Sequence, residues 1–411
     1  MDIIDSILQK DKWEEFLEYR YQRHNLSKSE YGAWREFIDR EGYRGIAEGL
    51  INGSFLAPLP VRMEINKTGS RKKRVVYSYP EDFSRILKFI CHALYRYDHV
   101  FSDNCYAFRP AKCSKDAVRK ISETLRKTEV YSLKADISDY FNSIDTDRLL
   151  SRLEFLKKED GRLFKFFEEM LRADAAITEA GGEILHLKRG AMAGIPVAPF
   201  FANVYLSGTD RYFESSDVLY LRYSDDILIC AEDKTVLERA EEELFGRLAS
   251  DGLRLNEDKL DHYGPGESVE YLGLSIGSSG IDISEVTKQK LKDKIRRKAH
   301  ALRRWAVSKK LPPERGAKGF ISAMNHKLYN RSEDNSFSWS RWFFPCITTD
   351  ESLKELDAYM QQYARWCISG RHYKGNYRIS YGQLKDWGYK SLVHEYHSGA
   401  WKTALTGADA K

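Results

Sequence analysis

Two adjacent aspartates in the stretch LRYSDDILIC (residues 221–230) are the side chains best suited to chemistry. Asp225 and Asp226 stand between two apolar runs, so the pair marks either a plain hairpin turn or half of a metal site. Aspartate is a common turn residue, and a solvated turn is the more frequent outcome for such a pair taken alone. Because like charges this close repel each other, a buried pair would need a cation.

A third aspartate strengthens the metal interpretation. Asp136 lies at the end of the predicted strand EVYSLKADI (129–137), one residue before its last, while Asp139 and Asp145 nearby are candidates for helix capping. Hard divalent cations prefer carboxylate oxygens. A two-metal phosphoryl-transfer site draws carboxylates from separate strands onto ions roughly 3.5–4 Å apart. Asp136 together with the pair therefore favours a catalytic metal site over a solvated turn.

The predicted elements around these aspartates follow a recognisable order. In chain order they are a strand at 129–137, helices at 146–175 and 198–213, strands at 218–223 and 227–231, a helix at 234–252 and a strand at 268–276. A β-α-β-β-α-β order with antiparallel pairing predicts a ferredoxin-like sheet, and so an α+β fold. Upstream, residues 3–50 and 82–97 are predicted to be helical, and residues 61–80 form a hairpin with Gly69-Ser70 at its turn.

The C-terminal part of the chain is helical and basic. Residues 288–310 hold eleven Lys or Arg against one acid, and Leu291, Ile295 and Leu302 keep one stripe apolar. Such a helix is suited to following a nucleic-acid backbone through phosphate contacts. Further on, residues 363–373 interleave aromatic and basic groups, which suits RNA binding and the core of a helical bundle about equally.

Composition sets the broad class. The chain has 411 residues, 42% hydrophobic and 31% charged, with a net charge of +5, which fits a folded protein of two or three domains. Its six cysteines form no CxxC pair, which argues against a zinc site and suits a reducing compartment. No apolar run approaches the 18 or so residues that cross a bilayer, and the N-terminus lacks a signal-peptide shape. We expect a cytoplasmic protein without a membrane partner.

Several motifs, in order, resemble bacterial reverse transcriptases of the group II intron and retron branch, and most of all its defence-associated members. The stretches are KTGSRKKRVVYSYPEDFSRILKFI, CYAFRPAKCS, KADISDYFNSI, RGAMAGIPVAPFFANVYL, LRYSDDILI, LRLNEDKL and EYLGLSI, together spanning roughly residues 60–275. The resemblance implies a right-hand polymerase with fingers, a ferredoxin-like (RRM-like) palm and a helical thumb. The implied division is a helical extension (1–55), fingers (56–128), palm with part of the fingers (129–280), and a basic thumb with the C-terminal region (281–411).

The resemblance also implies a set of site residues. Asp136, Asp225 and Asp226, with Ile137 beside them, would hold two Mg²⁺ ions, with Mn²⁺ as an alternative, and Lys259 would protonate the departing pyrophosphate. The implied nucleotide-binding residues are Lys72, Lys73, Arg74, Phe141, Gly194 and Tyr223, with Phe141 selecting deoxynucleotides. The implied nucleic-acid-binding residues are Arg109, Tyr271, Gly273, Arg296, Arg297, Arg303 and Arg304. Taken without the family, Lys259 reads as a surface lysine, Phe141 as a core aromatic, and Arg109 equally as a structural ion pair.

Two departures from the family pattern stand near the site. Met192-Ala193-Gly194 replaces the usual Pro-Gln-Gly, which removes a glutamine from the template-positioning motif. Ser224 occupies the second position of the hairpin motif. Neither change touches the predicted metal ligands, so we expect activity.

The implied function is RNA-directed DNA polymerisation by two-metal nucleotidyl transfer. The expected partners are dNTPs, an RNA template, here a structured noncoding RNA, and the cDNA product, in bacterial anti-phage defence. The alternatives are a retron-type enzyme, a protein-primed or untemplated DNA polymerase of the same superfamily, and a maturase-like RNA-binding protein. The intact set of three aspartates argues against the last of these.

Overall fold

The computed structural model describes residues 2–24, 26–66, 73–179, 181–329, 338–399 and 401. The chain divides into two compact units. The first comprises Met1–Tyr21, Leu26–Ala117 and Lys127–Glu267, and the second comprises Gln22–Asn25, Val118–Arg126 and Ser268–Lys411. Within the described ranges, no helix is both long and apolar enough to cross a membrane.

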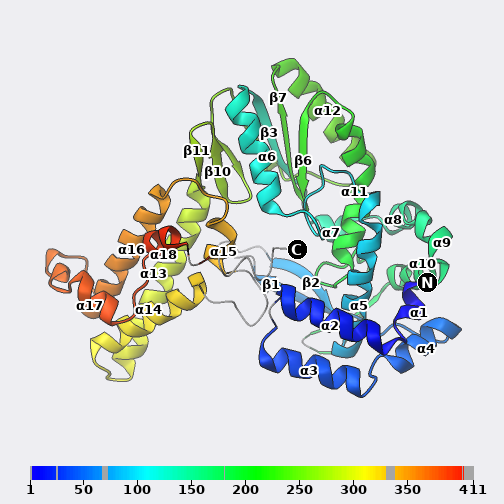
Figure 1. Ribbon diagram of the computed structural model, residues 1–411, viewed down its shortest axis with the longest axis horizontal. Coiled ribbons are helices and arrows are strands. Elements are labelled where there is room, and N and C mark those ends of the chain that lie inside the picture. Colours follow the sequence, from blue (N-terminus) through cyan, green and yellow to red (C-terminus); the bar gives the residue numbers. More distant parts are fainter. Residues whose placement is uncertain are drawn as a thin grey trace. The chain divides into compact units, whose positions relative to one another are not determined.

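A four-stranded antiparallel sheet, which we call the central sheet, lies in the first unit, and Figure 1 labels three of its strands, β3, β6 and β7. Its strands lie in the order β6-β7-β3-β8, which is the ferredoxin-like order for a β-α-β-β-α-β chain. They are β3 (Tyr131–Asp136), β6 (Leu219–Tyr223), β7 (Asp226–Ala231) and β8 (Asp261–Tyr263). The mixed helix and sheet content confirms the predicted α+β fold class.

Helices before and after the β6–β7 hairpin cover this sheet. Helix α11 (Ala198–Glu214) contacts β6, and α12 (Lys234–Ser250) contacts β3 and β7. Side chains of α11 are buried along most of its length, so it is a core helix, whereas α12 buries only the stripe Leu237, Ala240, Leu244 and Leu248. Helix α11 thus packs on β6, and α12 packs on β3 and β7. These contacts hold the strands whose ends carry the aspartates.

A second sheet of the first unit has the order β2-β1-β4-β5. Its strands are β1 (Val61–Asn66), β2 (Lys73–Ser78), β4 (Ala175–Thr178) and β5 (Ile184–His186). The predicted hairpin over 61–80 is confirmed in β1 and β2, which pair from Val61↔Ser78 to Asn66↔Lys73. Its predicted turn, Gly69-Ser70, lies outside the described residues.

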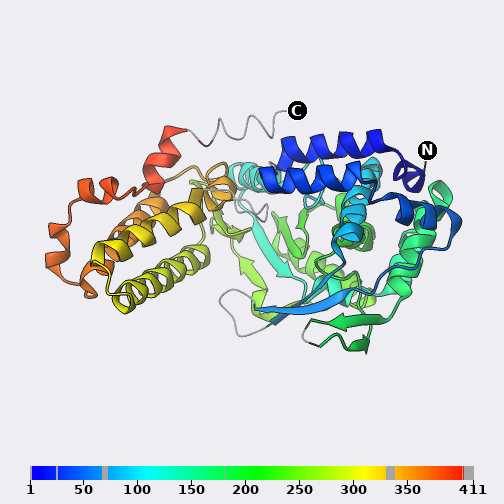
Figure 2. The ribbon, with the colours of Figure 1, turned by 90° about the horizontal axis from the view of Figure 1, so that it is seen from below.

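The remaining helices of the first unit surround an aromatic core. The Trp13 ring stacks on Phe89 at 4.4 Å and on Tyr43 at 5.1 Å between ring centroids. Figure 2 shows the N-terminal helices α2 and α3 side by side. The elements are α1 (Ile3–Ser6), α2 (Lys10–His24), α3 (Lys28–Asp39), α4 (Arg44–Asn52), α5 (Glu81–Ala93), η1 (Leu94–Val100), α7 (Tyr140–Ser143), α8 (Thr146–Arg152), α9 (Glu154–Glu159), α10 (Gly161–Arg172) and η2 (Glu257–Lys259). Helix α6 (Ser114–Lys127) has its middle turns in the second unit.

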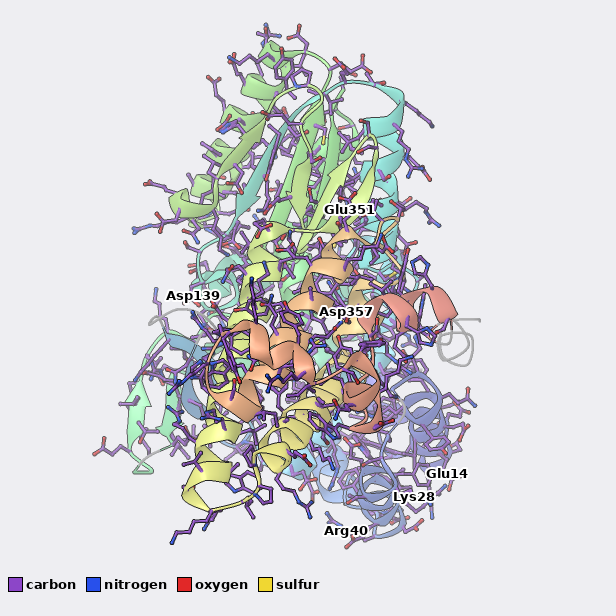
Figure 3. All side chains as sticks on the ribbon, turned by 90° about the vertical axis from the view of Figure 1, so that its left-hand side faces the viewer. Glu14, Lys28, Arg40, Asp139, Glu351 and Asp357 are labelled. Atoms are coloured by element: carbon purple, nitrogen blue, oxygen red, sulfur yellow. The ribbon has the colours of Figure 1, made fainter. Side chains whose placement is uncertain are left out.

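The second unit joins a small sheet to a helical bundle. Its antiparallel strands are β9 (Val269–Tyr271), β10 (Leu274–Gly277) and β11 (Gly280–Ile283). Helices α13 (Glu285–Ser308), α14 (Pro313–Tyr329) and α16 (Glu351–Ser369) pack against one another pairwise. The shorter elements are α15 (Trp339–Phe343), η3 (Lys374–Arg378), α17 (Tyr381–Asp386) and α18 (Leu392–Ser398). Figure 3 labels Glu351 and Asp357 on α16.

One predicted strand is placed differently. Residues 268–276 were expected to be the last strand of the central sheet, but they form β9 and β10 of the second unit's sheet. The short strand β8 takes the expected place beside β3. The cause is the turn Leu272-Gly273, where both residues have positive φ (+51° and +82°) and the chain folds back on itself. The four-domain division stays a prediction.

Candidate active site

The three predicted carboxylates lie at adjoining strand ends. Asp136 is the last residue of β3 and is paired in register with Asp226, the first residue of β7. The amide N–H of Ile137 donates a hydrogen bond to the carbonyl of Asp225 at 3.1 Å. Asp136 is 5% exposed, and Asp225 and Asp226 are partly buried. The structure therefore brings all three aspartates together at one end of the central sheet, where β3 ends and β7 begins.

The turn that carries Asp225 has an unusual backbone. Ser224 and Asp225 join β6 to β7 as a two-residue turn, and Ser224 has φ +61°. Side chains other than glycine rarely adopt this region, so the surrounding contacts must hold it. The Ser224 carbonyl accepts a hydrogen bond from Arg222 Nη1 at 3.1 Å.

Arg222 anchors the turn from inside the protein. Its side chain is fully buried and forms an ion pair with the fully buried Asp210 of α11. Arg222 Nε lies 2.7 Å from Asp210 Oδ1, and Nη2 lies 2.6 Å from Oδ2. Tyr220 donates its hydroxyl to Asp210 Oδ1 at 2.9 Å. This pair was missed from the sequence, although an arginine inside an apolar strand already signals a buried partner.

Lys259 supplies the positive charge at the site. Its Nζ lies 2.6 Å from Asp136 Oδ2, although about half of the lysine side chain remains exposed. Asn256 holds the same aspartate, because its amide N–H donates to the Asp136 carbonyl at 2.8 Å and its side chain reaches Oδ1 at 3.4 Å. Lys259 and Asp136 are therefore direct neighbours.

Burial and the charge of neighbouring carboxylates make Asp225 and Asp226 hard to ionise. Burial, and then the charge of Asp136, raise the pKa of Asp225. Burial, followed by Asp225 and Asp136, raises the pKa of Asp226 to about 6. Lys259 offsets only part of this effect at either group.

The carboxylates suit a hard divalent cation. No set of three or more His, Cys, Asp or Glu side chains within the described ranges is already arranged as a metal cluster. The oxygen donors of Asp136, Asp225 and Asp226 nevertheless are of the type that Mg²⁺ and Mn²⁺ prefer. Burial and the neighbouring carboxylates raise the pKa values of Asp225 and Asp226, and a bound cation would offset this penalty on their charged forms. Ile137 lies in the same backbone pairing and is itself buried.

The segment of Phe141 lies against the altered motif. The Phe141 carbonyl accepts from the Ala191 amide at 2.8 Å, and the Ala193 amide donates to Asn142 Oδ1 at 3.3 Å. The Ala193 carbonyl in turn accepts from the Tyr77 amide of β2 at 2.7 Å. Gly194 has φ +104°, and a Cβ there would lie 2.8 Å from the Tyr77 carbonyl, so only glycine fits. Backbone hydrogen bonds thus hold this loop despite the missing glutamine.

The other predicted nucleotide-binding residues are scattered. Lys73 is exposed and pairs with Glu64 across the hairpin at 3.0 Å, and Arg74 is exposed. Lys72 lies outside the described residues. Tyr223 is partly buried at the end of β6, and burial raises its pKa to about 12.

Three of the predicted nucleic-acid-binding residues are buried or make contacts inside the protein. The Arg109 side chain is 4% exposed and pairs with Asp98 at 2.8 Å, and it also donates to the carbonyls of Ser102 and Cys105. Tyr271 is fully buried. A Cβ on Gly273 would lie 2.9 Å from Thr287 Oγ1. These contacts assign packing roles to all three residues, and nucleic-acid contact by them stays an untested prediction.

The predicted nucleic-acid-binding arginines of α13 separate into two kinds. Arg296, Arg297 and Arg304 are exposed on α13, with Arg296 near Asp293 at 3.1 Å. Arg303 instead donates to the carbonyls of Cys367 and Ile368 near the end of α16, at 3.1 and 3.0 Å. Exposed carbonyls at a helix C-terminus favour such a cation.

Comparison with known proteins identifies the family. The family described as reverse transcriptase (RNA-dependent DNA polymerase) matches residues 65–276, slightly more than half of the chain. The matched region contains all the predicted catalytic residues. The chain belongs to the reverse transcriptase family.

The individual proteins similar to this chain have low sequence identity to it. The Escherichia coli retron Ec86 reverse transcriptase is 26% identical over 205 residues, which cover 49% of this chain and 58% of that protein. The chain thus spans less than two thirds of this curated relative. Telomerase from Candida albicans, solved with a fragment of telomeric RNA, is 13% identical with a TM-score of 0.46, covering 91% of this chain and 71% of that one. Apo telomerase from Candida tropicalis is 11% identical with a TM-score of 0.47, covering 90% and 67%.

Proposed function

We propose that the chain is an RNA-directed DNA polymerase that extends a primer with deoxynucleotides. The observation that carries this proposal is the placement of Asp136, Asp225 and Asp226 at adjoining strand ends of a ferredoxin-like sheet, with Lys259 in contact. Carboxylates from separate strands and a nearby ammonium group are what nucleotidyl transfer requires. The proposal therefore rests on the site as well as on family membership.

Each side chain has a role in this proposal. Asp136, Asp225 and Asp226, with Ile137 beside them, would hold Mg²⁺ or Mn²⁺, which when bound neutralises phosphate charge and makes the primer 3′-hydroxyl more acidic. Lys259 donates a proton to the leaving pyrophosphate. Lys73 and Arg74 attract the triphosphate, and the Phe141 ring excludes a ribose 2′-hydroxyl. Positioning and charge neutralisation contribute most of the rate.

Primer extension tests the proposal directly. Purified protein is given an RNA template, a DNA primer, dNTPs and Mg²⁺, and extension is followed on a gel. Asp226→Asn is expected to lower the rate more than about a hundredfold, because it removes a charge at the reacting phosphate. Asp217→Asn is the matched control, since Asp217 is an exposed aspartate of the same unit. Equal rates for the two variants would exclude catalysis at this end of the sheet.

We further propose that the template is a structured noncoding RNA and that the cDNA serves anti-phage defence. The support is the resemblance of the C-terminal sequence SYGQLKDWGYKSLVHEYH to defence-associated enzymes. Sequencing the nucleic acid that copurifies with the protein should give cDNA copied from one bound RNA. Protection in a phage plating assay should disappear with Asp226→Asn. Protection that survives in this variant would favour a maturase-like RNA-binding role.

A retron-type enzyme is the second candidate. The observation that favours it is the 26% identity to a retron reverse transcriptase. The copurified product would then be DNA joined to RNA through a 2′,5′ branch, which a debranching enzyme cleaves. Random or homopolymeric DNA attached to a tyrosine or serine would instead show protein-primed synthesis.

A further inference from the structure

A small hollow lies in the second unit, where the end of α16 meets η3. Its volume is about 340 Å³, which is at the lower end of the roughly 300–1,000 Å³ typical of small-molecule pockets. It is outside the segment that matches the reverse transcriptase family. The described lining residues are Gln362, Arg365, His372, Tyr373, Asn376 and Tyr377.

Arg365 lines this hollow and has no carboxylate partner among the described residues. Its side chain belongs to a residue only 7% exposed, and its Nε donates to the Ile379 carbonyl at 2.9 Å. Among the residues that the structure describes, neither Nη group has a hydrogen-bond acceptor, and no acid acts on the guanidinium. Burial lowers the pKa of Arg365, and only Tyr377 and Tyr389 oppose that effect. The Nη atoms are open to solvent, because neither is among the fully buried side-chain atoms that lack a hydrogen-bond partner, so an anionic group of a ligand in the hollow can reach them.

Two of the tyrosines that line the hollow are open to solvent. Tyr373 is 56% exposed and Tyr377 is 66% exposed, which is high for aromatic side chains. The Arg365 guanidinium lies 5.5 Å from the Tyr377 ring centre. The loop is held in place, because Asn376 Nδ2 donates to the Arg371 carbonyl at 2.7 Å. The hollow is therefore lined by two exposed aromatic rings and by a guanidinium that has no acid partner among the described residues.

Positive charge continues beyond the hollow. Arg371, Lys374 and Arg378 are all exposed on the same short stretch, RHYKGNYR (371–378). A mononucleotide would occupy only the hollow, whereas a strand would also place neighbouring phosphates over these cations. Stacked bases and flanking phosphates together are the ligand chemistry of single-stranded nucleic acid.

We propose that this hollow captures one unpaired base of a single-stranded nucleic acid, with Tyr373 and Tyr377 stacking on the base and Arg365 contacting its phosphate. This base pocket would be a binding site separate from the carboxylates that carry the proposed polymerase function. It selects unpaired over paired strands, because a base inside a duplex cannot enter a hollow of this size. Gln362 and His372 also line the hollow and add polar groups to it.

Fluorescence anisotropy with the full chain tests the pocket. The probes are a labelled 12-nucleotide RNA of mixed sequence, the DNA of the same sequence, each annealed to its complement, and a free deoxynucleoside triphosphate as competitor. Tyr373→Ala with Tyr377→Ala is expected to weaken binding of a single strand about tenfold or more. Binding of the duplexes should be unchanged. Whether the RNA or the DNA shows the loss identifies the strand recognised.

A matched control distinguishes stacking from general damage. Tyr381 is 40% exposed in the same region and does not line the hollow, so Tyr381→Ala should bind like the unaltered protein. Arg365→Met should reproduce the tenfold loss, whereas Arg378→Met, which removes an exposed charge, should cause a smaller one. A 4-thiouridine probe should cross-link by ultraviolet light to the peptide that contains residues 371–378.

The results separate this proposal from the proposed function. Asp226→Asn should abolish synthesis and leave single-strand binding intact, so a chain without polymerase activity can still confirm the base pocket. Equal single-strand affinities for the double tyrosine variant and Tyr381→Ala would overturn the proposal. So would a loss that is as large for the duplexes, or a cross-link confined to other peptides.

Discussion

Two buried arginines, one in each unit, are held in opposite ways. Arg222 in the first unit is 0% exposed and shares two short contacts with the Asp210 carboxylate. Arg365 in the second unit is 7% exposed and, among the described residues, bonds only to a backbone carbonyl and a tyrosine face. Burial opposes both charges. Asp210 raises the pKa of Arg222 well above its usual range, whereas the pKa of Arg365 is lowered.

The comparison separates an arginine whose charge is neutralised within the fold, Arg222, from one whose charge has no acid partner among the described residues, Arg365. The second unit can satisfy a buried charge when the fold needs it. Asp357, labelled in Figure 3, also lies on α16. It accepts hydrogen bonds from Tyr389, Ser391 and the first amides of α18 at distances from 2.5 to 3.1 Å. Arg365 has no such set. We interpret Arg222 as a positioning residue for the Ser224-Asp225 turn, and Arg365 as a ligand-binding residue of the proposed base pocket.

Breaking the Arg222–Asp210 pair should give the largest effect. Asp210→Asn or Arg222→Met leaves one partner buried without its counterion, which typically costs about 3–5 kcal/mol. We expect the urea unfolding midpoint of either variant to fall sharply, as followed by tryptophan fluorescence. A variant that unfolds like the unaltered protein would show that the pair is not needed for stability.

Replacing both members separates stability from positioning. Arg222→Met with Asp210→Leu removes the pair without leaving an isolated charge, so most of the lost stability should return. Primer extension should stay at least about tenfold slower, because the Ser224 carbonyl has lost its donor while the backbone keeps φ +61°. The loss is expected in kcat rather than in KM. Full recovery of the rate would assign the pair a purely structural role.

A pH titration tests the third kind of buried charge, the aspartates. Asp226 has a folded pKa of about 6 against an ordinary value of 3.8, so the folded state favours its protonated form. That stabilisation is complete below about pH 4 and is lost as the pH rises through 6. Without metal, the free energy of unfolding should therefore fall by about 2 kcal/mol from pH 4 to pH 7, an amount reduced for partial exposure.

Two comparisons identify the source of this pH dependence. Asp226→Asn should flatten the profile because it cannot ionise. Millimolar Mg²⁺ should also flatten it, because a bound cation compensates the carboxylate charge. A profile that is as steep in Asp226→Asn would place the titrating group elsewhere.

The sequence was most informative where one local pattern decides the structure. The β6–β7 hairpin, with Asp225 at its tip and Asp226 starting β7, follows from two apolar runs that flank a polar break. Helix α12 follows from its apolar stripe and ends within two residues of the predicted end at Gly252. The position of Asp136 at a strand end was likewise visible.

Long-range pairing was not predictable in the same way. Whether β8 or β9 completes the sheet depends on a backbone reversal at Leu272-Gly273, which hydrophobic alternation does not encode. Asp210 and Arg222 are twelve residues apart on different elements, so their contact required the fold. Arg365 lay in a region where the aromatic and basic pattern fitted a bundle core and RNA binding equally. The lack of an acid partner for Arg365 among the described residues is the observation on which the proposed base pocket rests.

Arg365→Met should produce the smallest change in stability, and it contrasts directly with Arg222→Met. The substitution loses one hydrogen bond to Ile379 and the contact with Tyr377, but it also removes a buried charge that has no acid beside it in the described structure. These effects oppose each other, so the free energy of unfolding should change by less than about 1 kcal/mol. The same urea experiment compares the two variants, and Arg378→Met controls for loss of an exposed cation. A loss of 3 kcal/mol or more, similar to that of Arg222→Met, would mean that Arg365 is held by the fold as firmly as Arg222.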